Sequence, residues 1–147
     1  MPFYAIYDVG DYTFAQYKVV WAEMAGTLQA AVIGSAIVPY GGGMKPIVPD
    51  HKVYFAPFDD HRHAHYVCAL LNSTLIRTFI DSFTIKLQVG TLFRHIRLPS
   101  FAPADPTHRQ LVQLSQDAHM ILAQGGGADS ISAQRQAIDT LVERIIG

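Results

Sequence analysis

Residues 61–83, HRHAHYVCALLNSTLIRTFIDSF, decide the fold of this chain. Their apolar side chains follow the i, i+3, i+4 spacing of an amphipathic helix in two successive stripes: Ala64, Val67, Cys68 and Leu71, then Leu75, Phe79, Ile80 and Phe83. Asn72 and Ser73 separate the stripes, and serine is favoured at the start of a helix. The pattern predicts two helices joined by a bend. Because so apolar a pair must be covered, we expect it to form the core, with residues 96–99 and the preceding strand-like segments as its covers.

The composition fits one domain with an apolar surplus. A chain of 147 residues can bury roughly two-thirds of its unfolded surface. Charged residues make up only 16% and hydrophobic residues 50%, so we expect an exposed apolar patch that docks against another molecule. Glycines and prolines interrupt the longest low-charge run, residues 24–44, which is too broken to span a bilayer.

Cysteine usage and the first residues of the sequence bear on the compartment. The single cysteine, Cys68, lies in the helical stripe and has no partner for an internal disulfide. The opening residues, MPFY, lack the basic and apolar regions of a secretory signal, so we expect a cytoplasmic protein. The net charge of −1 gives no global argument for nucleic-acid binding, although a basic stripe can exist within a balanced total.

The segments before the helix pair have the composition of strands. Alternating aromatic and β-branched residues predict strands at 3–9, 17–24 and 52–57. Residues 28–38 also favour a strand, with a bulge at Gly34. Residues 39–49, PYGGGMKPIVP, hold three prolines and three glycines and are predicted to form a loop.

The predicted helices have recognisable starts. Asp59 and Asp60 precede the helix pair as acidic caps. Asp105 followed by Pro106 is typical of a helix start, and that helix is expected to run to the glycines at 125–127. Ser130 is predicted to cap a last helix, which has the apolar stripe Ile131, Ile138, Leu141, Val142 and Ile145. Between the helix pair and the helix that starts at Asp105, residues 84–94 are expected to be extended or a loop, and residues 95–98 are expected to form a short strand.

Together these elements predict an α+β fold, because strands come first and helices last. We expect an N-terminal mixed or antiparallel twisted sheet packed on the central helix pair, followed by two C-terminal helices. Residues 1–147 form a single domain in this interpretation, with the sheet and central helices in 1–104 and the C-terminal helices in 105–147.

The common catalytic signatures are absent from the sequence. It has no dinucleotide-binding or P-loop glycine motif, no H-E-x-x-H and no G-x-S-x-G. The glycines at 41–43 precede no serine, threonine or helix start that could present amides to a phosphate, which favours a flexible loop. Cys68 is predicted to be an inert packing residue. No triad can be built around the remaining histidines His95, His108 and His119.

A histidine cluster leaves two interpretations open. His61 and His65 share a helix face, and a nearby carboxylate could complete a zinc or nickel site with them. The alternative, which we favour, is a polar first helical turn exposed to solvent. The cluster comprises Asp59, Asp60, His61, His63 and His65.

Two segments carry residues suited to DNA contacts. Lysine and arginine bind phosphates, and arginine, lysine, glutamine and asparagine read base edges. Residues 45–52 and 86–94 offer these types between aromatic and apolar neighbours. Scattered basic residues are ordinary surface in most proteins, so composition alone does not favour nucleic-acid binding.

Four longer segments resemble a known family: YAIYDVGDYTFAQYKVVWAEMAGTLQAAVI, KPIVPDHKVYFAPFDD, AHYVCALLNSTLIRTFIDSF and HIRLPSFAPADPTHRQLVQLSQDAH. They are similar, in the same order, to the C-terminal target-recognition region of adenine-specific DNA methyltransferases of bacterial restriction-modification systems, the TaqI-like C-terminal specificity domain. The most specific pieces are YKVVW, IVPDH, CALLNS and IRLP, and IDTLV resembles the closing helix of those enzymes.

The sequence also departs from that family. It lacks the catalytic Asn/Asp-Pro-Pro-Tyr motif and the glycine-rich S-adenosylmethionine site, so we expect no methyl transfer by this chain alone. We expect a piece of a longer enzyme or a separate remnant, with S-adenosylmethionine bound to a catalytic domain in cis or in trans. Where the family tends to carry a glycine-rich loop, this chain has Thr-Ile-Lys-Leu-Gln-Val at 84–89.

The resemblance implies a non-catalytic domain that recognises double-stranded DNA. Its predicted phosphate contacts are Lys18, Lys45, Lys52 and Arg97, and its predicted base readers are Lys86, Gln88 and Arg94. A catalytic domain would flip and methylate the chosen adenine. Two alternatives stay open: a docking module or homodimer without DNA binding of its own, and a histidine-cluster metal protein.

Overall fold

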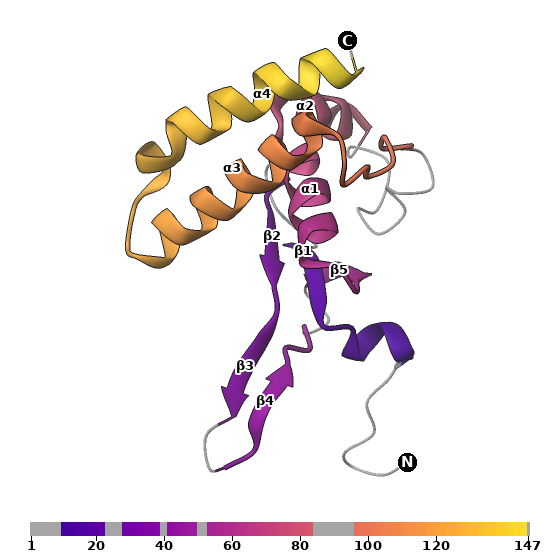
Figure 1. The fold of residues 1–147 in the computed structure, drawn as a ribbon, viewed down its shortest axis with the longest axis vertical. Coiled ribbons are helices and arrows are strands. Elements are labelled where there is room, and N and C mark those ends of the chain that lie inside the picture. Colours follow the sequence, from indigo (N-terminus) through magenta and orange to yellow (C-terminus); the bar gives the residue numbers. More distant parts are fainter. Residues whose placement is uncertain (1–9, 23–27, 39–40, 50–52, 84–95, 147) are drawn as a thin grey trace.

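The computed structural model describes residues 10–22, 28–38, 41–49, 53–83 and 96–146 (Figure 1). Its strands are β1 Tyr17–Ala22, β2 Ala30–Ile33, β3 Ser35–Val38, β4 Gly43–Pro46 and β5 Val53–Phe58. Its helices are α1 His61–Asn72, α2 Thr74–Phe83, α3 Pro106–Ala123 and α4 Ser132–Ile146, with short 3-10 helices η1 Asp11–Phe14 and η3 Ala128–Ile131. The predicted α+β class is confirmed.

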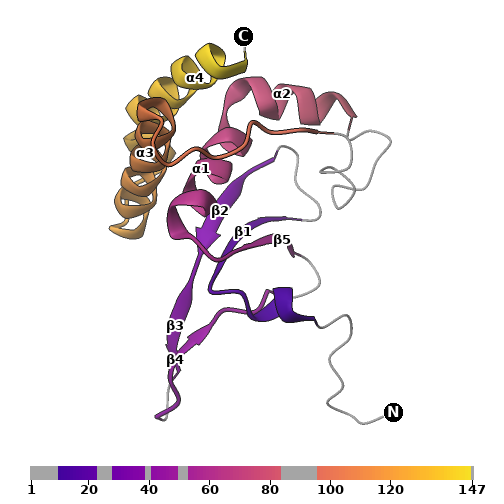
Figure 2. The same ribbon diagram turned by 45° about the vertical axis from the view of Figure 1, so that its right-hand side comes forward.

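The strands form two antiparallel units. β1 is the centre of a three-stranded sheet with the order β2-β1-β5, and β3 pairs with β4 in a separate two-stranded ribbon. Gly34 separates β2 from β3, so the predicted strand 28–38 exists but is divided at its glycine between the two units. Figure 2 shows α1 crossing one face of the three-stranded sheet, with α3 and α4 on its other side.

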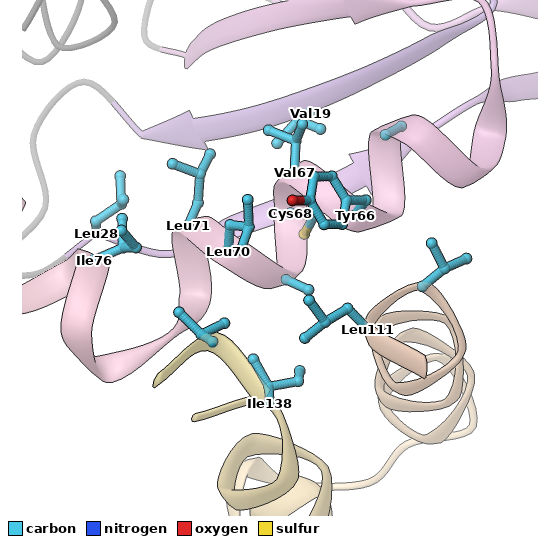
Figure 3. Close-up of a cluster of buried hydrophobic side chains, with 14 of the residues drawn as sticks. Val19, Leu28, Tyr66, Val67, Cys68, Leu70, Leu71, Ile76, Leu111 and Ile138 are labelled. Atoms are coloured by element: carbon cyan, nitrogen blue, oxygen red, sulfur yellow. The ribbon is translucent and has the colours of Figure 1, made fainter. Parts of the chain in front are cut away.

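Helix α1 is the centre of the core, as its sequence predicts. Residues 64–71 are all buried, because the sheet covers one side of the helix and α3 and α4 cover another. Leu70, Leu71 and Val19 are fully buried there, with Leu111 from α3 and Ile138 from α4 close by (Figure 3). This buried stretch is accordingly almost entirely apolar, with His65 as its exception.

The segment after α2 covers the core as expected, but not as a strand. Ile96, Leu98 and Phe101 pack against the core, and the Tyr66 hydroxyl donates to the Pro99 carbonyl at 3.0 Å. Residues 96–98 make no strand pairing, so the predicted short strand is wrong for these residues. Side-chain packing, rather than a ladder of backbone hydrogen bonds, holds the segment in place.

The predicted starts of three helices are confirmed. Asp60 Oδ1 accepts from the Arg62 amide at 2.8 Å at the start of α1. Asp105 Oδ1 accepts from the amides of Thr107 and His108 at 2.7 and 3.3 Å at the start of α3. At the start of α2, Ser73 Oγ accepts from the Ile76 amide at 3.4 Å.

The sequence did not indicate a second stabilising contact at α2. The Asp139 carboxylate of α4 accepts from the Thr74 amide and from the Thr74 hydroxyl, both at 2.7 Å. An acidic side chain at a helix N-terminus satisfies free amides and interacts favourably with the helix dipole. This contact ties the last helix to the central pair.

Two further predictions were wrong. Residues 43–46, expected in a loop, form β4. The last helix starts at Ser132 rather than at a Ser130 cap, because residues 128–131 form η3. The strand predicted at 3–9 and the segment 84–94 lie outside the described residues. Within the described ranges, no helix is both long enough and apolar enough to cross a membrane.

Candidate nucleic-acid interface

A two-stranded ribbon projects from the body of the molecule. We call β3 and β4 the arm; its paired residues are Ser35 and Pro46, Ala36 and Lys45, Ile37 and Met44, and Val38 and Gly43. Both views show the arm extending away from the helices (Figures 1 and 2). At its base, the Ile47 amide donates to the Gly34 carbonyl at 3.1 Å, which continues the pairing up to the end of β2.

The two faces of the arm differ in chemistry. Side chains alternate along a strand, so Ile37 and Met44 share one face, and Ala36 and Lys45 share the other. Ile37 is 77% exposed and Met44 is 64% exposed. Large apolar side chains directly opposite each other usually have a cover. None of the residues that the structure describes supplies one, so this face is available to another molecule.

The arm carries one charge, which is positive. Between Glu23 and Asp50, Lys45 is the only charged residue in the sequence, and it is exposed on β4. With no acidic side chain in this stretch to offset it, the arm presents a positive potential to a polyanion. Lys45, a predicted phosphate contact, is thus exposed on the arm.

Side chains from two helices fix the strand from which the arm extends. Asn72 of α1 pairs with both backbone groups of Ala30: its Oδ1 accepts from the amide at 2.9 Å and its Nδ2 donates to the carbonyl at 2.8 Å. His119 of α3 accepts from the Val32 amide through Nε2 at 2.9 Å and donates through Nδ1 to the Ser115 carbonyl at 2.7 Å. These contacts satisfy backbone hydrogen-bonding groups on the edge of β2 that does not pair with β1, and they give the arm a rigid base.

Substitution of Asn72 tests that anchoring. Asn72→Ala is expected to destabilise the protein by roughly 1–3 kcal/mol, because the amide and carbonyl of Ala30 lose their partners. The Ala30 amide should also exchange its hydrogen faster in native protein. Denaturant unfolding and hydrogen exchange provide the two measurements. Gln113→Ala, which removes only an exposed contact to Asp117, should change neither; equal effects of the two substitutions would contradict the anchoring role.

The structure divides the histidine cluster: His61 and His65 contact each other, whereas Asp60 and His63 have other partners. His65 is buried against α3, so the expectation of an exposed polar turn was wrong for this residue. The Asp60 carboxylate binds the Arg62 guanidinium at 3.1 Å, and His63 stacks on Phe101 with ring centroids 5.4 Å apart. Among the described residues, no three histidine, cysteine, aspartate or glutamate side chains converge as metal ligands would.

His61 and His65 form part of a directed hydrogen-bond chain between α1 and α3. Gln116 Nε2 donates to His61 Nδ1 at 3.3 Å, so His61 donates through Nε2 to His65 Nε2 at 3.1 Å. His65 Nδ1 then donates to Ser115 Oγ at 2.8 Å. Burial, together with the neighbouring His119 and His61, lowers the pKa of His65 to about 3. His65 is therefore a neutral core residue at neutral pH.

The predicted packing role of Cys68 is confirmed. The thiol is fully buried, and burial raises its pKa to about 12, so the reactive thiolate does not form at neutral pH. Its Sγ donates to the Ala30 carbonyl at 3.4 Å, beside the Asn72 contact. Cys68 thus contributes to the same anchor of β2.

Lys18 was wrongly predicted as a phosphate contact. It is 1% exposed, and its ammonium donates to the Ala15 carbonyl at 2.8 Å and lies 5.8 Å from the centre of the Phe55 ring. Burial lowers the pKa of its amine. A buried lysine with these contacts cannot reach a duplex, and its role is to close the sheet against the turn that precedes β1.

The remaining predicted contacts divide into three groups. Lys45 is exposed on the arm, and Arg97 is exposed on the segment that follows residue 95. These two elements lie toward opposite ends of the molecule and do not form one patch (Figure 1). Four predicted residues lie outside the described part of the chain: Lys52, Lys86, Gln88 and Arg94. The arm itself was not predicted, although a low-charge run with a single lysine indicated an unusual surface element.

Comparison with known proteins gives one informative relationship. The chain is 35% identical over 81 residues to the type II methyltransferase M.NspV of Nostoc sp.. The matched stretch covers 55% of this chain and 16% of that enzyme, so the chain corresponds to a small part of its relative. No protein-family model matches the chain, and no solved structure matches it significantly. The chain is thus related in sequence to part of a type II methyltransferase.

Proposed function

We propose that this chain is the DNA target-recognition part of an adenine-specific DNA methyltransferase of a restriction-modification system. In this proposal, the chain binds duplex DNA and selects the target sequence. A catalytic domain, in cis or in trans, holds S-adenosylmethionine and transfers the methyl group. The sequence relationship to a type II methyltransferase supports the proposal. The main structural observation in its favour is the arm.

The arm has the dimensions and charge that a groove binder needs. The major groove of B-DNA is about 12 Å wide and admits a two-stranded β-ribbon. Phosphates line both sides of the groove, so a ribbon whose only charge is the Lys45 ammonium meets no repulsion there. A ribbon anchored at one end by Asn72 and His119 would enter as a preformed element and lose little conformational entropy.

Other predicted contacts extend this interface. Arg97 is exposed and remains a proposed phosphate contact, on the segment between α2 and α3. Lys52 is proposed as a further phosphate contact, and Lys86, Gln88 and Arg94 as base readers. A duplex that touched both the arm and the segment before α3 would run along the long axis of the molecule (Figure 1).

Selection from a randomised duplex pool tests the function directly. The purified chain is expected to enrich a defined sequence, and its affinity for that duplex should fall steeply with salt, because cationic side chains release counterions from the phosphates. Fluorescence anisotropy over a salt series measures this. Failure to enrich any sequence, combined with an affinity that does not depend on salt, would contradict the proposal.

Lys45 is expected to contribute equally to the binding of all DNA sequences. Lys45→Ala should weaken binding to specific and unrelated duplexes by the same factor, and the slope of log affinity against log salt should decrease by about 0.9. The matched control is Arg144→Ala, which removes one exposed positive charge from the last turn of α4, away from the arm. Equal losses for the two variants would show a general charge effect instead of a contact made by the arm.

The apolar face of the arm also supports a second candidate, a docking or oligomerisation module. Ile37, Met44 and Val48 are exposed large apolar residues on or beside the arm. In this case the face would cover itself against a second copy or against the catalytic domain. Sedimentation over a concentration range tests the oligomerisation case, in which the purified chain forms larger species without DNA.

A further inference from the structure

We propose that the Ile37–Met44 face of the arm reads the methyl groups of thymine in the major groove. This inference rests on the proposed function and goes beyond it, because it assigns a base preference to two residues. It predicts that the recognised sequence contains A·T pairs where the arm enters.

The geometry of the arm makes these two side chains a single apolar surface. Ile37 and Met44 are directly paired across the ribbon, where opposite Cβ atoms lie about 5 Å apart. Both are mostly exposed, at 77% and 64%. Neither side chain offers a strong hydrogen-bond donor or acceptor, so the face cannot read the polar groups of a base.

The chemistry of the groove then selects one partner. The major-groove edges present donors and acceptors on every base, and thymine adds its C5-methyl group as an apolar feature. Placing an apolar face against a G·C pair would strip water from polar atoms without replacing their hydrogen bonds. Placing it against thymine methyl groups buries apolar area on both sides.

Charge and size favour DNA over a second protein. Lys45 is on the opposite face of the same ribbon, from which its long side chain can extend toward the phosphates at the edge of the groove. A stable protein dimer buries roughly 1,200–2,000 Å². Two side chains on an eight-residue ribbon supply only a small part of that area.

Replacing thymine by deoxyuridine in the selected duplex tests the inference without altering the protein. The exchange removes only the methyl group, and each contacted methyl is expected to contribute about fourfold in affinity, corresponding to one buried methyl-sized group. The change should appear at thymines in one segment of the site. Anisotropy with singly substituted duplexes locates them.

A protein variant links that effect to the arm. With Met44→Ser, the deoxyuridine effect should shrink or disappear at the same positions, because the face loses one of its two apolar side chains. Met120→Ser, which alters an exposed methionine on α3, should keep the response of the unmodified protein. Circular dichroism verifies that both variants are folded.

The outcomes separate this inference from the proposed function. Sequence-specific binding that is insensitive to deoxyuridine overturns the inference and leaves target recognition standing. A selected site without A·T pairs overturns it equally. Absence of duplex binding overturns both, and a dimer that Met44→Ser dissociates would identify the face as a contact between copies of this chain.

Discussion

Leu70→Ala is expected to destabilise the protein by roughly 2–5 kcal/mol, the largest effect among the substitutions considered. Leu70 is fully buried in α1, at the point where the helix faces both the sheet and the C-terminal helices (Figure 3). Truncation leaves a cavity. The sheet, α3 and α4 cannot move inward far enough to fill it, because backbone hydrogen bonds hold each of these elements in shape. Since folded domains are stable by only about 5–15 kcal/mol, a large share of the stability would be lost.

Leu75→Ala provides the matched control for that substitution. Leu75 is the same residue type in the next helix, and it is 42% exposed. Its truncation should cost less than about 1.5 kcal/mol, because water already covers much of the side chain. Denaturant midpoints measured by circular dichroism compare the two variants. Similar midpoints would mean that α1 is not the centre of the core.

The helix pair could be predicted because helical periodicity and capping are local in sequence. The apolar stripes on either side of Asn72 predict both helices. Asp60 and Asp105 predict the starts of α1 and α3 without any tertiary contact. Asn72 was recognised only as a break between helices. Its pairing with Ala30 joins residues 42 positions apart, and no local pattern encodes such a contact.

The arm was missed because its residues resemble a loop. Gly43 has a φ of +69°, a value favoured by glycine and usual in turns, and Pro46 at the end of β4 lacks an amide to donate. A ribbon exposed on both faces also has no buried side, so the alternation that identifies strands is weak. Prolines and glycines at 39–49 therefore predicted a loop where part of a ribbon forms.

Lys18 shows the opposite error, since a charged residue was placed on the surface by default. Its strand, β1, is the central strand of the sheet and has a neighbouring strand on each edge. Side chains of those neighbours can therefore lie over its residues on either face. The sequence showed alternation in residues 17–22 but not which element would lie over the second face. In the structure, the contact with Phe55 and the Ala15 carbonyl supply that cover.

Acidification is expected to destabilise the protein well before its carboxylates titrate. The pKa of His65 is lowered to about 3, against about 6.5 in the unfolded chain. The unfolded state therefore binds more protons between these values. The stabilisation is complete above about pH 6.5 and is lost as pH falls toward 3, by up to about 1.4 kcal/mol per pH unit. Urea unfolding at a series of pH values measures the slope.

The structural reason is that the imidazole of His65 cannot take a second proton without losing a contact. Nε2 accepts from His61, and Nδ1 already donates to Ser115. The other groups beside the His61–His65 hydrogen-bond chain are Gln116 and His119 from α3 and the Tyr17 ring from β1. The Tyr17 ring lies 5.1 Å from the His61 ring. Within the described residues, none of these carries a negative charge that could stabilise an imidazolium.

Two variants assign the slope to this histidine. His65→Asn removes the titrating group, so the free energy of unfolding, although lower at pH 7, should depend less on pH between about 6.5 and 5. His63→Asn alters a half-buried histidine that stacks on Phe101, and it should retain the steep dependence. If the slope were unchanged in His65→Asn, the proton uptake would have to come from another group. His65 and His119 both contact Ser115, and His119 accepts from the Val32 amide at the base of the arm, so protonation of His65 is expected to weaken that anchor as well.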